Sequence, residues 1–166
     1  MTFPNALCVA DLIDRGSLPK SSHVGSISFD AAANYPISVS RVFECLDATL
    51  SEDIAVVADP GDALFGAIDL TIHSRTEFIA CAYYASLGFA IPESIALQVA
   101  EPGWRPLVLV SDGAFQMIGL ELTTAARYGL TPIVVGLDNQ GYGTERPMLD
   151  GAFSDVHPWA VTAIPQ

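Results

Sequence analysis

Apolar and polar residues follow one another along the chain in blocks that predict helices and strands in turn. Between residues 38 and 50, apolar side chains recur every three or four positions, which is typical of an amphipathic helix, and Ser38 stands where its N-cap is expected. These apolar positions are Val39, Val42, Phe43, Leu46 and Leu50. Residues 54–58 then form a short, wholly apolar run, which predicts a strand buried on both faces, as in parallel sheets.

The clearest unit of the sequence lies downstream of this strand. Residues 107–110 have the pattern of a buried strand, residues 114–128 that of a helix, and residues 133–137 that of a second buried strand. Gly129 stands where a left-handed residue is expected to end the helix. A strand, a helix and a strand joined by short loops form a βαβ unit, which implies a parallel sheet. We therefore predict an α/β fold in which helices sandwich a parallel sheet.

Two further stretches are less regular. Residues 78–99 permit a helix, although Gly88 and Pro92 must interrupt or kink it. Residues 1–36 contain many breakers and little periodicity. We expect residues 1–36 to be an irregular linker or the tail of a preceding domain, and residues 37–166 to form one α/β domain.

Composition and charge exclude several classes of protein. The 166 residues include 7 Lys+Arg and 19 Asp+Glu, which gives a formal net charge of −12. Such acidity without a basic cluster argues against nucleic-acid binding, because neutralising phosphates needs clustered lysine and arginine. The longest uncharged apolar stretch, residues 78–92, is shorter than the roughly 20 residues that span a bilayer, and the N-terminus makes a poor secretory signal. We expect a cytoplasmic protein that binds neither nucleic acid nor membrane, with Cys8, Cys45 and Cys81 reduced.

Polar, glycine-bearing loops follow the predicted strands at residues 59–62, 111–113 and 138–141. Ligands of open α/β sheets bind at the carboxyl ends of the strands, so we expect Asp112 and Asn139 to face one crevice. A carboxylate, an amide oxygen and a backbone carbonyl suit Mg²⁺ or Ca²⁺, and a helix N-terminus favours the diphosphate that such a cation would hold. In the competing interpretation, Asp112 is a helix cap and the asparagine lies in a turn. Spacing alone leaves both interpretations open.

Longer motifs distinguish these interpretations. Ser111-Asp112-Gly113, an intervening helix and Asp138-Asn139 resemble the thiamine diphosphate motif, Gly-Asp-Gly followed by a helix and Asn-Asn. The run SDGAFQMIGLELTTAARYGLTPIVVGLDNQGYGTER and the segments ADPGDALFG and YYASLGF also resemble stretches of the pyruvate and indolepyruvate decarboxylases. The resemblance, strongest over residues 58–149, indicates the C-terminal diphosphate-binding domain of a thiamine-diphosphate-dependent 2-oxo acid decarboxylase. It implies that this domain is residues 37–166, with its C-terminal part incomplete.

The resemblance implies two groups of residues around the cofactor diphosphate. Mg²⁺ would be held by the side chains of Asp112 and Asn139 and by the carbonyl of Gly141. The remaining diphosphate contacts would come from Asp62, Gly113, Ala114 and Thr144. Three substitutions depart from the family pattern, namely Ser111 and Asp138 in the motif and Ala114 in place of a hydroxyl residue. None of them removes a predicted metal ligand.

The resemblance also implies contacts to the rest of the cofactor and to substrate. Leu87 would be the bulky aliphatic residue that holds thiamine diphosphate in its V conformation, and Ala85 would offer its carbonyl to the 4′-amino group. Glu145 matches a glutamate that lies near the reacting 2-oxo acid. From the residues alone, Leu87 also suits a core position, and Glu145 suits a solvated loop or a pairing with Arg146.

The family's active site also needs a pyrimidine-binding domain, which supplies the glutamate that protonates the aminopyrimidine ring. No segment of this chain matches that domain. We therefore expect a domain that binds thiamine diphosphate and Mg²⁺, is barely active alone, and works with a pyrimidine-binding domain from another segment or chain in a homo-oligomer. The substrate would be a 2-oxo acid similar to pyruvate, phenylpyruvate or indolepyruvate. The alternative is a non-catalytic binding or interaction module that retains the fold.

Overall fold

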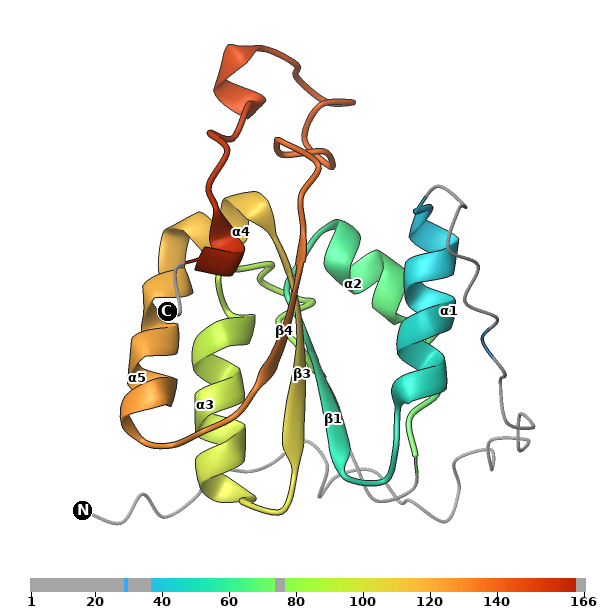
Figure 1. Ribbon diagram of the computed structural model, residues 1–166. Coiled ribbons are helices and arrows are strands. Elements are labelled where there is room, and N and C mark those ends of the chain that lie inside the picture. Colours follow the sequence, from blue (N-terminus) through green and yellow to red (C-terminus); the bar gives the residue numbers. More distant parts are fainter. Residues whose placement is uncertain (1–28, 30–36, 74–76, 164–166) are drawn as a thin grey trace.

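A four-stranded, all-parallel sheet lies between two layers of helices (Figure 1). The computed structural model describes residues 29, 37–73 and 77–163, so most of the segment expected to be a linker lies outside the described residues. The strands follow the spatial order β2-β1-β3-β4. They are β1 (Ile54–Ala58), β2 (Phe78–Ala80), β3 (Arg105–Ser111) and β4 (Ile133–Leu137). The predicted α/β fold with a parallel sheet is confirmed.

The register of the sheet explains why β1 and the middle of β3 are apolar. Val57 of β1 pairs with Val108 of β3, and Leu109 of β3 pairs with Val135 of β4. Because successive side chains point to opposite faces of a sheet, β1 and residues 106–110 of β3 are apolar where both faces are covered, and the polar Arg105 and Ser111 lie at the ends of β3. The two buried clusters of side chains, one on each face, share these two strands.

Each layer of helices covers one of these faces. The helices α1 (Val39–Thr49) and α2 (Asp62–Ala67) pack on one side of the sheet. On the other side are α3 (Ala90–Ala100), α4 (Asp112–Ile118) and α5 (Leu122–Arg127). Figure 1 shows the two layers on either side of β1, β3 and β4. None of the described helices combines the length and apolar character needed to cross a bilayer.

Helix α1 begins as the sequence predicts. The hydroxyl of Ser38 accepts a hydrogen bond from the Arg41 backbone N–H, with 3.3 Å between the two atoms. Ser38→Ala is expected to lower the free energy of unfolding by about 1 kcal/mol, because that helix-terminal N–H loses its partner. Urea unfolding measures the change. Ser40→Ala is the control, since the Ser40 hydroxyl donates to the exposed Glu44 side chain and not to a helix-terminal backbone group. Equal losses in both variants would contradict the capping role.

The prediction of a helix over residues 78–99 is wrong in its first half. Residues 78–80 form β2, the edge strand parallel to β1, and α3 begins only at Ala90. The left-handed backbone of Gly88, with φ of +85°, separates the two elements. Pro92 lies in the first turn of α3, where its missing N–H costs no helical hydrogen bond, and it therefore does not kink the helix.

The predicted single helix over residues 114–128 is also interrupted. It begins two residues earlier, at Asp112, and passes through a 3₁₀ turn at Gly119–Glu121 between α4 and α5. The Phe115 ring lies directly against Gly119 at this 3₁₀ turn, which is possible because glycine has no Cβ. A Cβ on Gly119 would lie 2.5 Å from the ring. Gly129 has the expected left-handed conformation, with φ of +68°.

Candidate functional site

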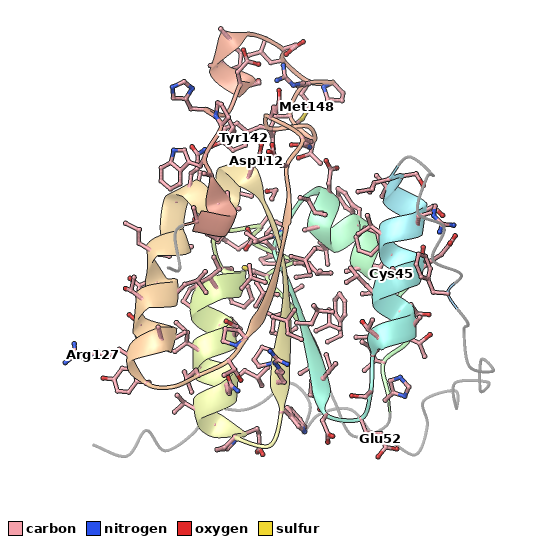
Figure 2. The ribbon with its side chains drawn as sticks, viewed as in Figure 1. Cys45, Glu52, Asp112, Arg127, Tyr142 and Met148 are labelled. Carbon is pink, nitrogen blue, oxygen red and sulfur yellow. The ribbon has the colours of Figure 1, made fainter. Side chains whose placement is uncertain are left out.

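The loops that follow the strands meet at the carboxyl end of the sheet. Asp112, the first residue of α4, is buried, with 8% of its surface exposed. Its Oδ1 accepts a hydrogen bond from the Gly113 N–H at 2.8 Å, and its Oδ2 accepts one from the Gly141 N–H at 3.1 Å. One carboxylate therefore joins the loops after β3 and β4. Figure 2 shows Asp112 and Tyr142 at this end of the sheet and Glu52 at the opposite end.

A second link joins the loop after β4 to the start of α2. The Asn139 side-chain N–H donates to Asp62 Oδ2, with 3.0 Å between the atoms. This bond engages the amide nitrogen of Asn139, so its amide oxygen is the atom left for a ligand. The residue before Asp62 also lies close to the segment after β4, because a Cβ on Gly61 would be 3.6 Å from Thr144 Oγ1. Together with the bond between Gly141 and Asp112, these contacts bring the loops after β1, β3 and β4 close to one another.

Glycines make this convergence possible. A Cβ on Gly113 would lie 2.6 Å from the Tyr142 ring, so the ring covers the turn between β3 and α4. A Cβ on Gly143 would lie 2.9 Å from the Asn139 amide nitrogen and 3.0 Å from an Asp62 oxygen. A side chain at either glycine would fill the space where the loops approach each other.

Residues 140–156 form an arm that projects beyond the carboxyl end of the sheet, above α4 in Figure 1. The Tyr142 N–H donates to the Ser154 carbonyl at 2.8 Å, and Gly141 and Asp155 form an antiparallel bridge. Arg146 closes the arm with ion pairs to Asp150 and Asp155, each with an N–O distance of 2.7 Å. These hydrogen bonds raise the pKa of the Arg146 guanidinium, Asp155 contributing more than Asp150.

Glu145 is exposed in this arm. Of the two alternatives for Glu145, the pairing with Arg146 is not what the structure has, because the ion pairs of Arg146 among the described residues are with Asp150 and Asp155. The position of Glu145 is set by backbone bonds, since its N–H donates to the Tyr142 carbonyl at 3.1 Å. The backbone of Glu145 therefore lies in a hydrogen-bonded turn that directly follows Tyr142, Gly143 and Thr144.

Ala85 and Leu87 lie in the loop of residues 81–89, between β2 and α3. Ala85 has a left-handed backbone, with φ of +57°, and Leu87 is 37% exposed, so Leu87 is not a core residue. The loop reaches the first turn of α4, because a Cβ on Gly88 would lie 3.5 Å from the Ala114 carbonyl oxygen. The structure therefore places this loop beside Ala114.

Three residues that organise the site were not identified from the sequence. They are Asp59, which follows β1, Tyr142, which covers Gly113, and Arg146, which closes the arm. Only Asp59 carries a signal in the sequence, an acidic residue directly after a wholly apolar strand. The roles of Tyr142 and Arg146 depend on contacts across turns that no local pattern specifies.

The donor set suits a hard divalent cation bound together with a diphosphate. Asp112 provides a carboxylate, Asn139 an amide oxygen and Gly141 a backbone carbonyl, and oxygen ligands of this kind hold Mg²⁺ while leaving positions for phosphate oxygens. No group of three or more His, Cys, Asp or Glu side chains gathers to hold a metal in the described ranges, so a cation here depends on the amide and carbonyl oxygens. Mg²⁺ and a diphosphate fit these residues.

The fold and the joined loops define an α/β cofactor-binding domain with its site at the carboxyl ends of a parallel sheet. The sequence profile of the family described as thiamine pyrophosphate enzyme, C-terminal TPP binding domain, matches residues 60–158, and the chain belongs to this family. Thiamine pyrophosphate is another name for thiamine diphosphate. The family predicted from the motifs is confirmed.

Curated relatives agree with this family. The indole-3-pyruvate decarboxylase of Azospirillum brasilense is 33% identical over 151 residues, which are 90% of this chain and 27% of the relative. The alpha-keto-acid decarboxylase of Mycobacterium tuberculosis (strain ATCC 25618 / H37Rv) is 30% identical over 81% of this chain and 24% of the relative. That of Mycobacterium avium (strain 104) is 31% identical over 78% of the chain and 23% of the relative. The chain thus spans about a quarter of the length of these relatives.

Proposed function

We propose that this chain binds thiamine diphosphate together with Mg²⁺ as the cofactor-binding part of a 2-oxo acid decarboxylase. The observation that carries the proposal is a pair of hydrogen bonds that link the loops at the carboxyl end of the sheet, one of 3.1 Å from the Gly141 N–H to Asp112 and one of 3.0 Å from the Asn139 side chain to Asp62. The decarboxylase activity of the relatives supports the reaction class.

Each residue of this crevice has a separate task in the proposal. Asp112, the Asn139 amide oxygen and the Gly141 carbonyl hold Mg²⁺, and the cation neutralises the diphosphate without a lysine or arginine. The remaining contacts to the diphosphate come from Asp62, Gly113, Ala114 and Thr144. Asp112 already accepts hydrogen bonds from two backbone N–H groups, so its carboxylate is oriented before the metal binds.

The loop of residues 81–89 acts on the other half of the cofactor. Leu87, whose aliphatic side chain is partly exposed, would support the V conformation, and Ala85, whose backbone is left-handed, would offer its carbonyl to the 4′-amino group. The bound cofactor supplies the electron sink for decarboxylation, while these residues supply its orientation. Glu145, exposed in the arm beside the crevice, acts on the 2-oxo acid.

The proposed enzyme has partners beyond this chain. A pyrimidine-binding domain, from another segment or another chain, completes the cofactor site, and the substrate is an acid similar to pyruvate, phenylpyruvate or indolepyruvate. We propose that the complete enzyme is a homo-oligomer and lies in the cytoplasm. Tyr83 and Tyr84, exposed next to Ala85, lie on a surface that such an assembly would cover.

Isothermal titration calorimetry of the chain with thiamine diphosphate tests the binding function. The proposal predicts heat of binding in the presence of Mg²⁺ and none after the cation is removed with a chelator. Absence of any Mg²⁺-dependent heat would overturn the proposal and favour a non-catalytic module that retains the fold.

Glu145→Gln separates binding from the reaction. We expect the variant to bind thiamine diphosphate within about twofold of the original chain, because Glu145 lies outside the linked crevice residues. When the chain is paired with the preceding part of the Azospirillum brasilense relative, turnover of indole-3-pyruvate is expected to fall about a hundredfold, as for a lost acid–base group. A loss of cofactor binding in this variant would instead make Glu145 a cofactor ligand.

A further inference from the structure

Asp59 is a fully buried carboxylate at the carboxyl end of β1, and both of its oxygens accept backbone hydrogen bonds. Its Oδ2 accepts from the Gly88 N–H at 2.8 Å, and its Oδ1 accepts from the Ala90 N–H at 2.9 Å. The N–H of Asp59 itself donates to the Leu109 carbonyl at 2.9 Å and so continues the pairing of β1 with β3. The carboxylate is therefore fixed to the centre of the sheet.

The two groups that Asp59 holds lie at the junction of the 81–89 loop and α3. The residue at the N-terminal end of α3, Phe89, makes no side-chain capping bond, so Asp59 serves the first N–H groups of this helix from across the fold. On the other side of the loop, a Cβ on Gly88 would lie 2.8 Å from Ile118 of α4. Gly88 is thus held between the end of β1 and α4, directly after Leu87.

Burial of the Asp59 carboxylate opposes folding unless its hydrogen bonds offset the cost of removing it from water. Desolvation raises the pKa of Asp59 above its ordinary value, and the N–H groups of Gly88, Ala90 and Phe89 act in the opposite direction. An apolar residue of similar volume would avoid this desolvation, but it would leave two buried backbone N–H groups without acceptors. A bidentate acceptor therefore fixes the conformation of the loop end more tightly than apolar packing alone.

We propose that Asp59 is a positioning residue that fixes the 81–89 loop, and with it Ala85 and Leu87, against the aminopyrimidine and thiazolium rings of the cofactor. This inference rests on the proposed binding of thiamine diphosphate. It divides the site into two halves with separate supports. Asp112, which accepts from Gly141, and Asn139 would organise the diphosphate half, whereas Asp59, which accepts from Gly88 and Ala90, would organise the ring half.

The division predicts a difference between two ligands. In Asp59→Asn, the affinity for thiamine diphosphate with Mg²⁺ is expected to fall about tenfold, because an amide presents only one acceptor to the two N–H groups. The affinity for inorganic diphosphate with Mg²⁺ is expected to stay within about twofold, since that ligand has no rings. Calorimetry measures both affinities, and amide hydrogen exchange is expected to accelerate at Gly88 and Ala90 while the β3 amides stay protected.

Asp47→Asn is the matched control. The Asp47 carboxylate makes a comparable tie, accepting from the Thr71 N–H at 2.6 Å and from its hydroxyl at 3.4 Å, but it lies between α1 and the segment after α2. We expect this variant to keep the affinities of the original chain for both ligands. If Asp59→Asn does not fold, Leu87→Ala at its exposed position provides the second test and is expected to show the same loss for thiamine diphosphate alone.

The outcomes are distinct. Equal losses for both ligands in Asp59→Asn, or unchanged affinity for thiamine diphosphate in the folded variant, overturn the positioning role. An original chain that binds the two ligands equally well also overturns it, because the rings then gain nothing from the loop. An original chain that binds neither ligand with Mg²⁺ overturns the proposed function itself, and the inference with it.

Discussion

Replacing Asp112 by asparagine is expected to lower the Mg²⁺-dependent affinity for thiamine diphosphate about a hundredfold or more. Asparagine retains the shape of the side chain but removes the negative charge that a divalent cation requires from this donor set. In the native chain each oxygen of the carboxylate accepts one hydrogen bond, from the N–H of Gly113 or of Gly141. Asparagine has only one oxygen for these two donors. The loop that carries the predicted Gly141 ligand loses part of its anchor at the same time.

Calorimetry of the Asp112→Asn variant is best compared with that of Asp138→Asn. Asp138 is an exposed acid in the loop after β4 that carries Asn139 and Gly141, and it accepts a hydrogen bond from the Gln140 N–H at 3.2 Å. If the general negative charge of the crevice attracted the cation, the two substitutions would weaken binding alike. Retention of Mg²⁺-dependent binding by Asp112→Asn would place the crevice elsewhere.

Gly141→Ala is expected to have the second large effect, on both stability and binding. A Cβ at this position would lie 2.5 Å from the Ser154 carbonyl oxygen and 2.5 Å from Arg146 Nη2. The arginine can move, but the carbonyl belongs to the backbone that pairs with this loop. We expect the free energy of unfolding to fall by about 1–3 kcal/mol and the cofactor affinity to fall about tenfold, because the loop must separate from its partner.

Thermal unfolding and calorimetry of this variant need a glycine control from the same chain. Gly103 is suitable, since a Cβ there meets no atom within 4 Å. Gly103→Ala should leave both quantities nearly unchanged. Equal stability of Gly141→Ala and the original chain would mean that the arm adapts freely and that its pairing does not fix the crevice.

The elements that could be predicted from the sequence are those specified by local patterns. Wholly apolar runs located β1 and β4 to the residue. For β1 the reason is burial on both faces, which leaves no polar position. Strand β4 lies at the edge of the sheet and is only partly buried, so the expectation of a buried strand over residues 133–137 is wrong in its degree of burial. The strand-end rule and the motif single out Asp112, Asn139 and Gly141, and the structure links their loops by hydrogen bonds from Gly141 to Asp112 and from Asn139 to Asp62. The parallel sheet was therefore predictable from local patterns, whereas the roles of these residues toward a metal stay predictions.

The elements that were missed depend on contacts distant in sequence. The short edge strand β2 takes its conformation from pairing with β1, and nothing within residues 78–80 distinguishes it from a helix. Asp59 acts on N–H groups about thirty residues later, so its role required the folded chain. The turn between α4 and α5 follows from the packing of Phe115 on Gly119, a contact that helix propensity does not register.

The position of the bound metal decides whether the loops after β3 and β4 form the proposed site. With thiamine diphosphate present and Mn²⁺ in place of Mg²⁺, paramagnetic broadening of backbone amide signals reports which residues surround the cation. We expect the signals of Asp112, Gly113, Asn139 and Gly141 to broaden first, while those of Glu52, at the opposite end of the sheet, remain sharp (Figure 2). Broadening spread over the acidic surface, or centred away from the loops after β3 and β4, would contradict the proposed site.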